Sequence, residues 1–392
     1  MRALTWQGTN KVSVETVPDP TIQEPDDVII QVTTTGLCGS DLHLYDPLGP
    51  FLHPGDVLGH EPMGRVVERG SAITDLQLGD RVVIPFQIAC GSCFMCQRGL
   101  QTQCETTQVR EHGMGAALFG YTDLYGAVPG GQAELLRVPK AGYGPIKIES
   151  DLDDERFVYL SDVAPTAWQG VEYSGAQPGD TLLIVGLGPI GEMAARIALL
   201  RGVRVIGVDL VPERLQRSAS LGVETIDLTD GDPVAAVLDR TEGRGADAAL
   251  EAVGMEAHGS GIAEAAQKVV GLLPKAMARP LMTHASTDRL AALDLALQAV
   301  RRGGVVSISG VYAGAADPFS MQLIFDKQLT LRMGQANVKR WVDDILPLAL
   351  DDADPLGLAG FATHHLTLED APDAYEMFQK KQDGAIKVLF MP

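Results

Sequence analysis

Short apolar runs separated by Gly, Pro and Asp fill the chain from its start to about residue 160. The clearest runs cover 28–32, 65–67, 81–84 and 135–138. Runs of this length, bounded by residues that favour turns, are typical of β-strands. The pattern therefore predicts a β-rich region in the first part of the chain.

From about residue 165 the pattern changes to an alternation of strands and helices. The first strand of this region is rich in apolar residues, as expected for a parallel strand that is covered on both faces. The alternation predicts an α/β domain with a doubly wound parallel sheet. The predicted strands are 181–185, 203–208, 246–253 and 305–309, and the predicted helices are 189–200 and 212–221.

Residues 255–303 are long for one crossover between adjacent strands, and we interpret them as an insertion in this domain. They contain helix-like stretches at 262–270 and 289–301 around a middle rich in Pro and Met. A chain of 392 residues exceeds the usual size of a single hydrophobic core, so two domains are expected.

Composition excludes several classes of function. Hydrophobic residues make up 45% of the chain, and no run approaches the roughly 18 apolar residues that span a bilayer. There are 31 Lys and Arg against 51 Asp and Glu, which gives a net charge of −20. Such a surface would repel nucleic acid and anionic lipid. The start of the chain shows no secretory pattern, so we expect a cytoplasmic protein.

Four of the five cysteines form a local cluster: Cys90, Cys93, Cys96 and Cys104 stand at C-x2-C-x2-C-x7-C spacing. They are too close together to staple distant parts of a large fold by disulfides. The short gaps let neighbouring sulfur atoms meet at one ion, and the longer gap lets the chain turn back to complete a tetrahedron. The pattern predicts a structural zinc site in a lobe of residues 88–106, with an iron–sulfur cluster as the alternative.

A glycine-rich turn follows the predicted strand 181–185 at once and opens a helix. It contains Gly186, Gly188 and Gly191 in G-x-G-x-x-G spacing, which lets a pyrophosphate approach the free N–H groups of a helix N-terminus. Asp209 ends the next predicted strand, where a carboxylate accepts hydrogen bonds from the adenosine ribose hydroxyls and repels a 2′-phosphate. The turn and Asp209 predict that the protein binds NAD in preference to NADP. NADP is the alternative, because Arg214 lies close in sequence to Asp209.

A second metal site is indicated by Cys38 and His60, which stand in the β-rich region. A catalytic zinc takes three protein ligands and keeps one position for water or substrate. Taken alone, Cys38 is equally compatible with a small buried hydrophobe, and His60 with a structural histidine. These two residues do not define the site without a third ligand.

Taken together, these motifs resemble the zinc-containing alcohol dehydrogenase group of the medium-chain dehydrogenase/reductase superfamily. The resemblance covers the chain from end to end, and its strongest motifs are 36–43, 59–61, the four-cysteine lobe, the glycine turn and the tail 365–390. Within the group the sequence most resembles the glutathione-independent formaldehyde dehydrogenase and formaldehyde dismutase branch. Residues 130–134, 160–166 and the insertion after Gly254 carry that closer resemblance.

The resemblance implies a GroES-like catalytic domain at 1–164 and 337–392, and a Rossmann NAD-binding domain at 165–336. It implies that Cys38, His60 and Asp162 bind the catalytic zinc, with Glu61 as a nearby carboxylate. Most members of the group are expected to carry cysteine where Asp162 stands. The hard carboxylate oxygen should make the zinc a stronger Lewis acid. An aspartate that only caps a helix or turn is the simpler alternative.

The resemblance also assigns a proton path and further cofactor contacts. Ser40 takes the proton of the substrate hydroxyl and His43 passes it toward solvent, although His43 is also compatible with an ordinary surface histidine. The implied cofactor contacts, besides the three glycines, are Pro189, Ile190, Asp209, Arg214, Val253, Gly254 and Val311.

The expected function is hydride transfer between NAD and a primary or short alcohol or aldehyde, with formaldehyde among the candidates. Residues 106–129, which include Phe119, Tyr121 and Tyr125, are candidates for the substrate pocket, as is Trp168. The alternatives are a dismutase with tightly held NAD, a non-catalytic zinc and dinucleotide module, and a zinc hydrolase. A homodimer or homotetramer is expected from the resemblance.

Overall fold

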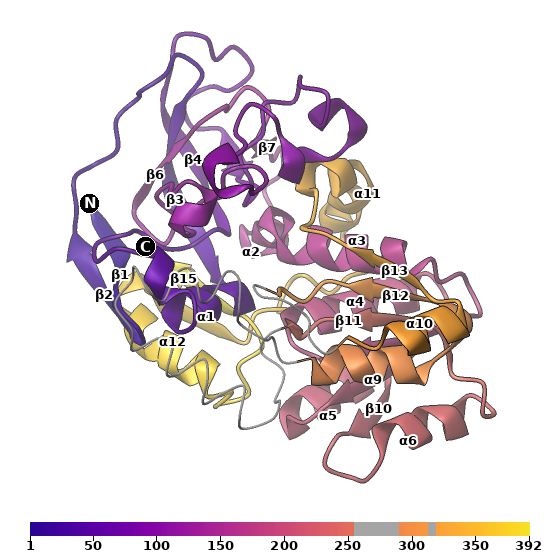
Figure 1. Cartoon of the computed structure of the whole chain (residues 1–392). Coiled ribbons are helices and arrows are strands. Elements are labelled where there is room, and N and C mark those ends of the chain that lie inside the picture. The colour runs from indigo at the N-terminus through magenta and orange to yellow at the C-terminus, as the bar shows by residue number, and fades with distance from the viewer. Residues whose placement is uncertain (255–289, 313–318) are drawn as a thin grey trace. The chain divides into compact units, whose positions relative to one another are not determined.

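A computed structural model describes residues 1–254, 290–312 and 319–392 (Figure 1). The chain divides into two units, Met1–Pro165 with Ala336–Pro392, and Thr166–Gln335. The division lies within one residue of the expected domain limits at 164 and 336. Helix α3 (Val163–Ser174) contains the first boundary.

The first unit is built around a sheet in the order β14-β15-β3-β4-β5-β7, with β6 also paired to β3. Val28, Ile30 and Val32 of β3 join one hydrophobic core cluster with Val66 of β4. A separate pair, β1 with β2, is antiparallel. The strands of this unit are β1 (Arg2–Gly8), β2 (Lys11–Thr16), β3 (Val28–Leu37), β4 (Pro62–Arg69), β5 (Arg81–Val83), β6 (Leu135–Val138), β7 (Ile146–Lys147), β14 (His364–Thr367) and β15 (Val388–Met391).

Helices and 3-10 turns of the first unit stand between or after these strands. The last strand, β15, pairs antiparallel with the end of β3, with Val388 opposite Leu37. This pairing brings the C-terminal segment beside the residues that precede Cys38. The helices are α1 (Gly39–Tyr45), α2 (Glu155–Val158), α11 (Val338–Leu350) and α12 (Ala371–Gln379), with 3-10 turns η1 (Gly49–Phe51), η2 (Cys96–Arg98), η3 (Gln101–Gln103), η4 (Arg110–His112), η5 (Asp123–Tyr125), η6 (Tyr159–Ser161) and η8 (Leu368–Asp370).

The second unit contains a parallel sheet in the order β10-β9-β8-β11-β12-β13. Counted along the unit, this is the order 3-2-1-4-5-6 of a doubly wound dinucleotide-binding sheet, and the direction of winding reverses between β8 and β11. The elements are β8 (Thr181–Val185), α4 (Pro189–Leu200), β9 (Arg204–Asp209), α5 (Pro212–Ser220), β10 (Glu224–Asp227), α6 (Pro233–Arg240), β11 (Ala246–Glu251), α9 (Ala291–Ala299), β12 (Val300–Ile308), α10 (Met321–Lys327) and β13 (Thr330–Met333).

The predicted strand 181–185 and helix 189–200 are confirmed with the same bounds as β8 and α4. Strand β12 begins at Val300, five residues before its predicted start. Of the expected insertion 255–303, residues 255–289, with the predicted helix 262–270, lie outside the described residues. The described part of this segment, from residue 290 on, forms α9 and the start of β12. These two elements belong to the alternation of strands and helices in the second unit. In the described ranges, no helix has the length and apolar character needed to cross a membrane.

Candidate active site and metal centres

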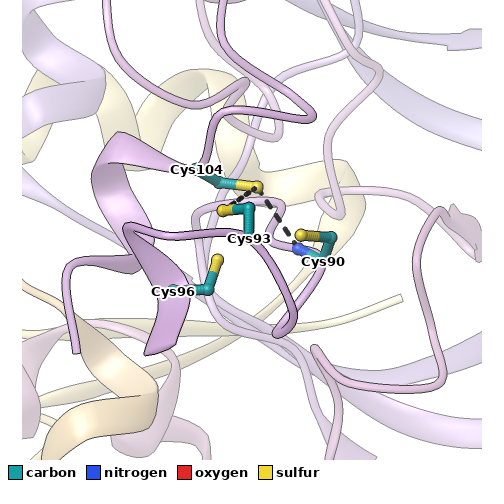
Figure 2. A group of neighbouring side chains, drawn as sticks. All are labelled: Cys90, Cys93, Cys96 and Cys104. Carbon is teal, nitrogen blue, oxygen red and sulfur yellow. Dashed lines mark hydrogen bonds between the residues drawn. The ribbon is translucent and has the colours of Figure 1, made fainter. Parts of the chain in front are cut away.

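Cys90, Cys93, Cys96 and Cys104 form one group, which we call the thiol cluster. Their sulfur atoms lie within 4.8 Å of one another, and Figure 2 shows the four side chains pointing toward a common centre. The Sγ atoms of Cys93 and Cys104 are 4.0 Å apart. A tetrahedron with Zn–S bonds of about 2.3 Å has edges of about 3.8 Å. The cysteines form no disulfides, and their spacing fits a closed zinc site.

Neighbouring donors favour the thiolate form of Cys90 in this cluster. Burial raises the pKa of Cys90, but hydrogen bonds from the Thr106 hydroxyl and from nearby backbone N–H groups lower it to about 5. The Thr106 Oγ1 to Cys90 Sγ distance is 3.2 Å. Burial and the neighbouring Cys93 raise the pKa of the Cys96 thiol instead. Four thiolates so close together repel one another, so a divalent cation is the natural partner of this donor set.

Cys38, His60, Glu61 and Asp162 form a second group, which we call the mixed cluster. All four are buried, and their ligand atoms also lie within 4.8 Å of one another. Asp162 Oδ2 is 3.6 Å from Cys38 Sγ and 3.3 Å from His60 Nε2. Cys38 follows β3, His60 and Glu61 precede β4, and Asp162 follows η6. The fold thus brings together the residues that the sequence left far apart.

Asp41, to which the sequence analysis assigned no role, contacts two of these residues, Cys38 and His60, outside the group of ligand atoms. Its Oδ2 accepts the backbone N–H of Cys38 at 2.9 Å, and its Oδ1 lies 3.2 Å from His60 Nδ1. The Asp41 charge thus faces Nδ1 of the imidazole, while Nε2 lies toward Asp162 in the cluster. The only sequence signal was the position of Asp41 three residues after Cys38, at the start of α1.

Lys387 is a second residue that the sequence analysis missed. Its buried ammonium forms an ion pair with Glu61 Oε2 and donates to the Leu37 carbonyl at 3.0 Å. A side chain at Gly36 would overlap the Glu61 carboxylate and displace it from its present position. Among the described residues Glu61 Oε1 has no hydrogen-bond partner. This carboxylate therefore keeps one oxygen available beside the other ligands.

The charges of the mixed cluster also fit a cation. Burial, together with the charges of Glu61 and Asp162, raises the pKa of the Cys38 thiol. Burial also raises the pKa of Glu61. Several acidic groups in a buried space are stabilised when a metal ion compensates their charge. One sulfur, one imidazole nitrogen and carboxylate oxygens are all accepted zinc ligands.

The predicted proton-path residues both stand in helix α1. Ser40 Oγ is 3.2 Å from Cys38 Sγ. His43 is only 3% exposed, so it is not the surface histidine that was the simpler alternative. Its burial also differs from the expected place near solvent.

The glycine turn connects β8 to α4 as predicted. Gly186 has a φ of +91°, and a side chain at Gly191 would overlap the Gly186 carbonyl. Gly188 is the N-cap of α4 and Pro189 is its first residue, followed by Ile190. Asp209 Oδ2 accepts the N–H of Leu187 at 2.7 Å, within the turn. The turn has the open helix N-terminus and the close backbone packing that a pyrophosphate needs.

The remaining predicted cofactor residues lie at the same edge of the sheet. Arg214 Nη1 is 3.9 Å from Asp209 Oδ2. Val253 and Gly254 follow β11 directly, and Val311 follows β12 after two residues. Strands β8, β9, β11 and β12 are parallel, so these positions share the carboxyl edge, where ligands bind doubly wound sheets.

The candidate pocket aromatics separate into different environments. Phe119 belongs to the core of the first unit. Tyr121 and Tyr125 pack edge to face with centroids 5.5 Å apart. Burial raises the pKa of the Tyr121 hydroxyl and the charge of His60 opposes this rise, so Tyr121 lies near His60. In the second unit the Arg201 guanidinium lies 4.1 Å from the Trp168 ring. Of these candidates Tyr121 is the one near the mixed cluster, where the Phe86 ring also packs edge to face against His60 with centroids 6.4 Å apart.

Fold and site together define a zinc- and dinucleotide-binding protein, and comparisons with known proteins agree. The family model of the alcohol dehydrogenase GroES-like domain matches residues 24–148, and that of zinc-binding dehydrogenases matches 189–268. The chain is 39% identical to an uncharacterized zinc-type alcohol dehydrogenase-like protein, AdhB, of Bacillus subtilis, with both chains covered completely. It is 34% identical to the formaldehyde dismutase of Pseudomonas putida, over 97% of this chain and 95% of that one.

A solved structure supports the same assignment. Alcohol dehydrogenase TADH from Thermus sp. ATN1 superposes with a TM-score of 0.81 at 36% identity, over 100% of this chain and 99% of that one. The chain belongs to the zinc-containing alcohol dehydrogenases of the medium-chain dehydrogenase/reductase superfamily. Its first unit is GroES-like and its second is a Rossmann domain. The two clusters fit the two zinc ions of such an enzyme.

Proposed function

We propose that this enzyme transfers hydride between NAD(H) and a primary, short-chain alcohol or aldehyde, with Cys38, His60 and Asp162 as ligands of its catalytic zinc. The convergence of these three side chains within 4.8 Å is the observation that carries the proposal. When bound there, zinc supplies a Lewis acid for the substrate oxygen. NAD, when bound on the glycine turn, would accept the hydride.

The protein groups around this site orient ligands and move a proton. Asp41 faces His60 Nδ1 with its charge and accepts the backbone N–H of Cys38. Ser40 stands 3.2 Å from Cys38 Sγ, where its hydroxyl can take the proton of a bound substrate hydroxyl. His43 lies in the same helix and is the next acceptor in our proposal. Tyr121, close to His60, limits the size of the substrate.

NAD is preferred to NADP in this proposal because of Asp209. This carboxylate ends β9 and also accepts the N–H groups of Leu210 and Val211, at 2.7 and 2.9 Å. A 2′-phosphate brought to this position would meet a fixed negative charge. Arg214 already lies 3.9 Å from the same carboxylate, so its charge is directed toward Asp209.

A substrate panel tests the proposal. Absorbance at 340 nm is followed with short and long primary alcohols, each with NAD and with NADP, while zinc is counted per chain. We expect NAD reduction that requires an alcohol, declines with chain length and is lost on chelation. Turnover with NADP alone would contradict the role of Asp209. A protein that binds zinc and NADH but reduces no cofactor with any alcohol would be the non-catalytic module.

A dismutase is the second candidate, because the chain is 34% identical to a formaldehyde dismutase. Dismutation requires that the nucleotide stay bound between an oxidation and a reduction. The purified enzyme would then carry nucleotide and convert formaldehyde without added NAD. Rapid exchange of bound nucleotide with labelled NAD would exclude this candidate and leave the dehydrogenase.

We also propose that the enzyme is a homo-oligomer, through the edge of the second sheet. Phe325 is 86% exposed, and Met321 and Met333 are exposed with it. Within the described residues, β13 is the last strand of the sheet, and an unpaired edge beside apolar side chains favours association. Light scattering should give a mass above one chain, and Phe325→Glu should shift it toward the monomer. A wild-type monomer would contradict this proposal.

A further inference from the structure

A buried carboxylate ends β11, and neither metal cluster uses it. Glu251 is 0% exposed. Its Oε1 accepts two consecutive backbone N–H groups, from Val253 at 2.8 Å and from Gly254 at 2.7 Å. A carboxylate that accepts adjacent amides fixes the loop that carries them. Glu251 therefore determines the path of the chain as it leaves β11.

The same residue also holds the loop that follows β12. Its backbone carbonyl accepts the N–H groups of Ser309 at 2.9 Å and Gly310 at 3.1 Å. A side chain at Gly310 would overlap both Glu251 Oε2 and the Gly254 nitrogen. The two loops are thus in direct contact around one carboxylate. Burial raises the pKa of Glu251, while the hydrogen bonds from the N–H groups of Gly254 and Val253 oppose this rise.

This pair of loops lies at the point where the winding of the sheet reverses. Strands β8 and β11 are neighbours, with Val185 opposite Glu251. The N–H of Ala252 donates to the Val185 carbonyl at 2.9 Å. A side chain at Gly186 would collide with Val253. The glycine turn therefore packs directly on the loop that Glu251 fixes, and nucleotides bind in this crevice.

We propose that Glu251 is a positioning residue for the dinucleotide, which holds Val253, Gly254 and Val311 in the places where the nucleotide needs them. The inference rests on the proposed binding of NAD(H) to this unit. The length of the Glu251 side chain is the essential property, because its carboxylate must accept both backbone N–H groups from a position at the end of β11. Its charge is secondary, since an amide oxygen can accept the same two bonds.

Two conservative variants of the full-length protein separate the effect of side-chain length from the effect of charge. Glu251→Asp keeps the charge but is one methylene shorter, so it cannot accept both N–H groups from the same backbone position. Glu251→Gln keeps the length and an accepting oxygen. We measure the Kd for NADH by fluorescence and the unfolding midpoint of each variant. Expected is a Kd about tenfold higher for Glu251→Asp and within about twofold of wild type for Glu251→Gln.

Asp247→Asn is the matched control at the opposite end of β11. Asp247 accepts the Thr181 N–H at 2.9 Å and pairs with Arg301 at 2.8 Å. Loss of this charge in Asp247→Asn should lower the unfolding midpoint and leave the Kd for NADH unchanged. If Asp247→Asn weakens NADH binding as much as Glu251→Asp, the effect is general destabilisation and the inference is wrong.

The remaining outcomes distinguish the inference from the proposed function. Wild-type affinity in both Glu251 variants would overturn the positioning role while NADH binding itself stands. Weak binding by Glu251→Gln with normal binding by Glu251→Asp would assign the effect to charge, and would overturn it equally. A wild-type chain that does not bind NADH would contradict the proposed function itself.

Discussion

The thiol cluster and the mixed cluster each bring four ligand side chains together, but they draw them from different spans of the chain. The thiol cluster takes all its ligands from residues 90–104, whereas the mixed cluster takes Cys38, His60, Glu61 and Asp162 from three separate places. The first offers four soft sulfurs and fits a closed site. The second mixes sulfur, nitrogen and oxygen, as catalytic zinc sites do.

The two clusters also differ in what surrounds them. Donors beside the thiol cluster are local, such as the Thr106 hydroxyl and the N–H of Glu105, which donates to Cys93 Sγ at 3.4 Å. The mixed cluster is supported by Asp41 and by Lys387, which comes from the far end of the chain. The supporting groups of the thiol cluster thus come from its own loop, whereas those of the mixed cluster come from distant parts of the chain. Each prediction below tests one part of this contrast.

His60→Ala should give the largest effect, because it removes a ligand of the mixed cluster. We expect one zinc fewer per chain and a loss of NAD reduction of at least about a thousandfold, since zinc contributes several kcal/mol to catalysis. Atomic emission and absorbance at 340 nm measure the two quantities. The control is His365→Ala, which removes an exposed histidine paired with Glu155. Full activity in His60→Ala would refute the assignment of the mixed cluster.

Cys96→Ser should affect stability more than chemistry. Cys96 is a buried member of the thiol cluster, and structural zinc contributes directly to folding. We expect loss of one zinc and an unfolding midpoint lower by about 10 °C, with activity kept at low temperature. Ser92→Ala, which removes only a hydroxyl 3.7 Å from Cys90 Sγ, should change neither quantity. If Cys96→Ser abolished activity without lowering the midpoint, the roles of the two clusters would be reversed.

Asp41→Asn tests the support behind the mixed cluster. Removing the charge that faces His60 Nδ1 should weaken zinc binding or activity about 10- to 100-fold, as outer carboxylates do in other zinc sites. Asp27→Asn is the control, because Asp27 is also fully buried and accepts backbone N–H groups, but at the opposite end of β3. It should lower stability only. Equal zinc loss in both variants would show that Asp41 has no specific role.

The contrast also explains what the sequence could predict. The thiol cluster and the glycine turn depend on local spacing, and both were identified from a few neighbouring residues. Asp162 was assigned through the family resemblance, because nothing in its own surroundings marks a ligand. Lys387 could not be predicted, since only the pairing of β15 with β3 brings it to Glu61.

The fold shows the same dependence on local pattern. Strand β8 is buried along its whole length and was predicted with its observed bounds, whereas β10 (Glu224–Asp227) is short and partly exposed and was missed. A four-residue strand with one fully buried side chain has too little apolar pattern to identify it. Helix α6, which follows it, begins with a side-chain cap from Asp232 and a proline in its first turn, and this local pattern is typical of a helix start.

Thr106→Val should give the smallest effect, and it tests whether the donors around the thiol cluster matter at all. The change replaces a hydroxyl that lies 3.2 Å from Cys90 Sγ by a methyl group of similar size. A typical hydrogen bond is worth about 1 kcal/mol net, and sulfur is a weak acceptor, so zinc affinity in competition with a chelator should fall about fivefold. Thr107→Val is the matched control, because its hydroxyl donates to the Ile88 carbonyl instead of to a sulfur. Unchanged affinity in Thr106→Val would mean that the four sulfur atoms alone determine the binding of this zinc. A fall that appears in both variants would point to the packing of the loop.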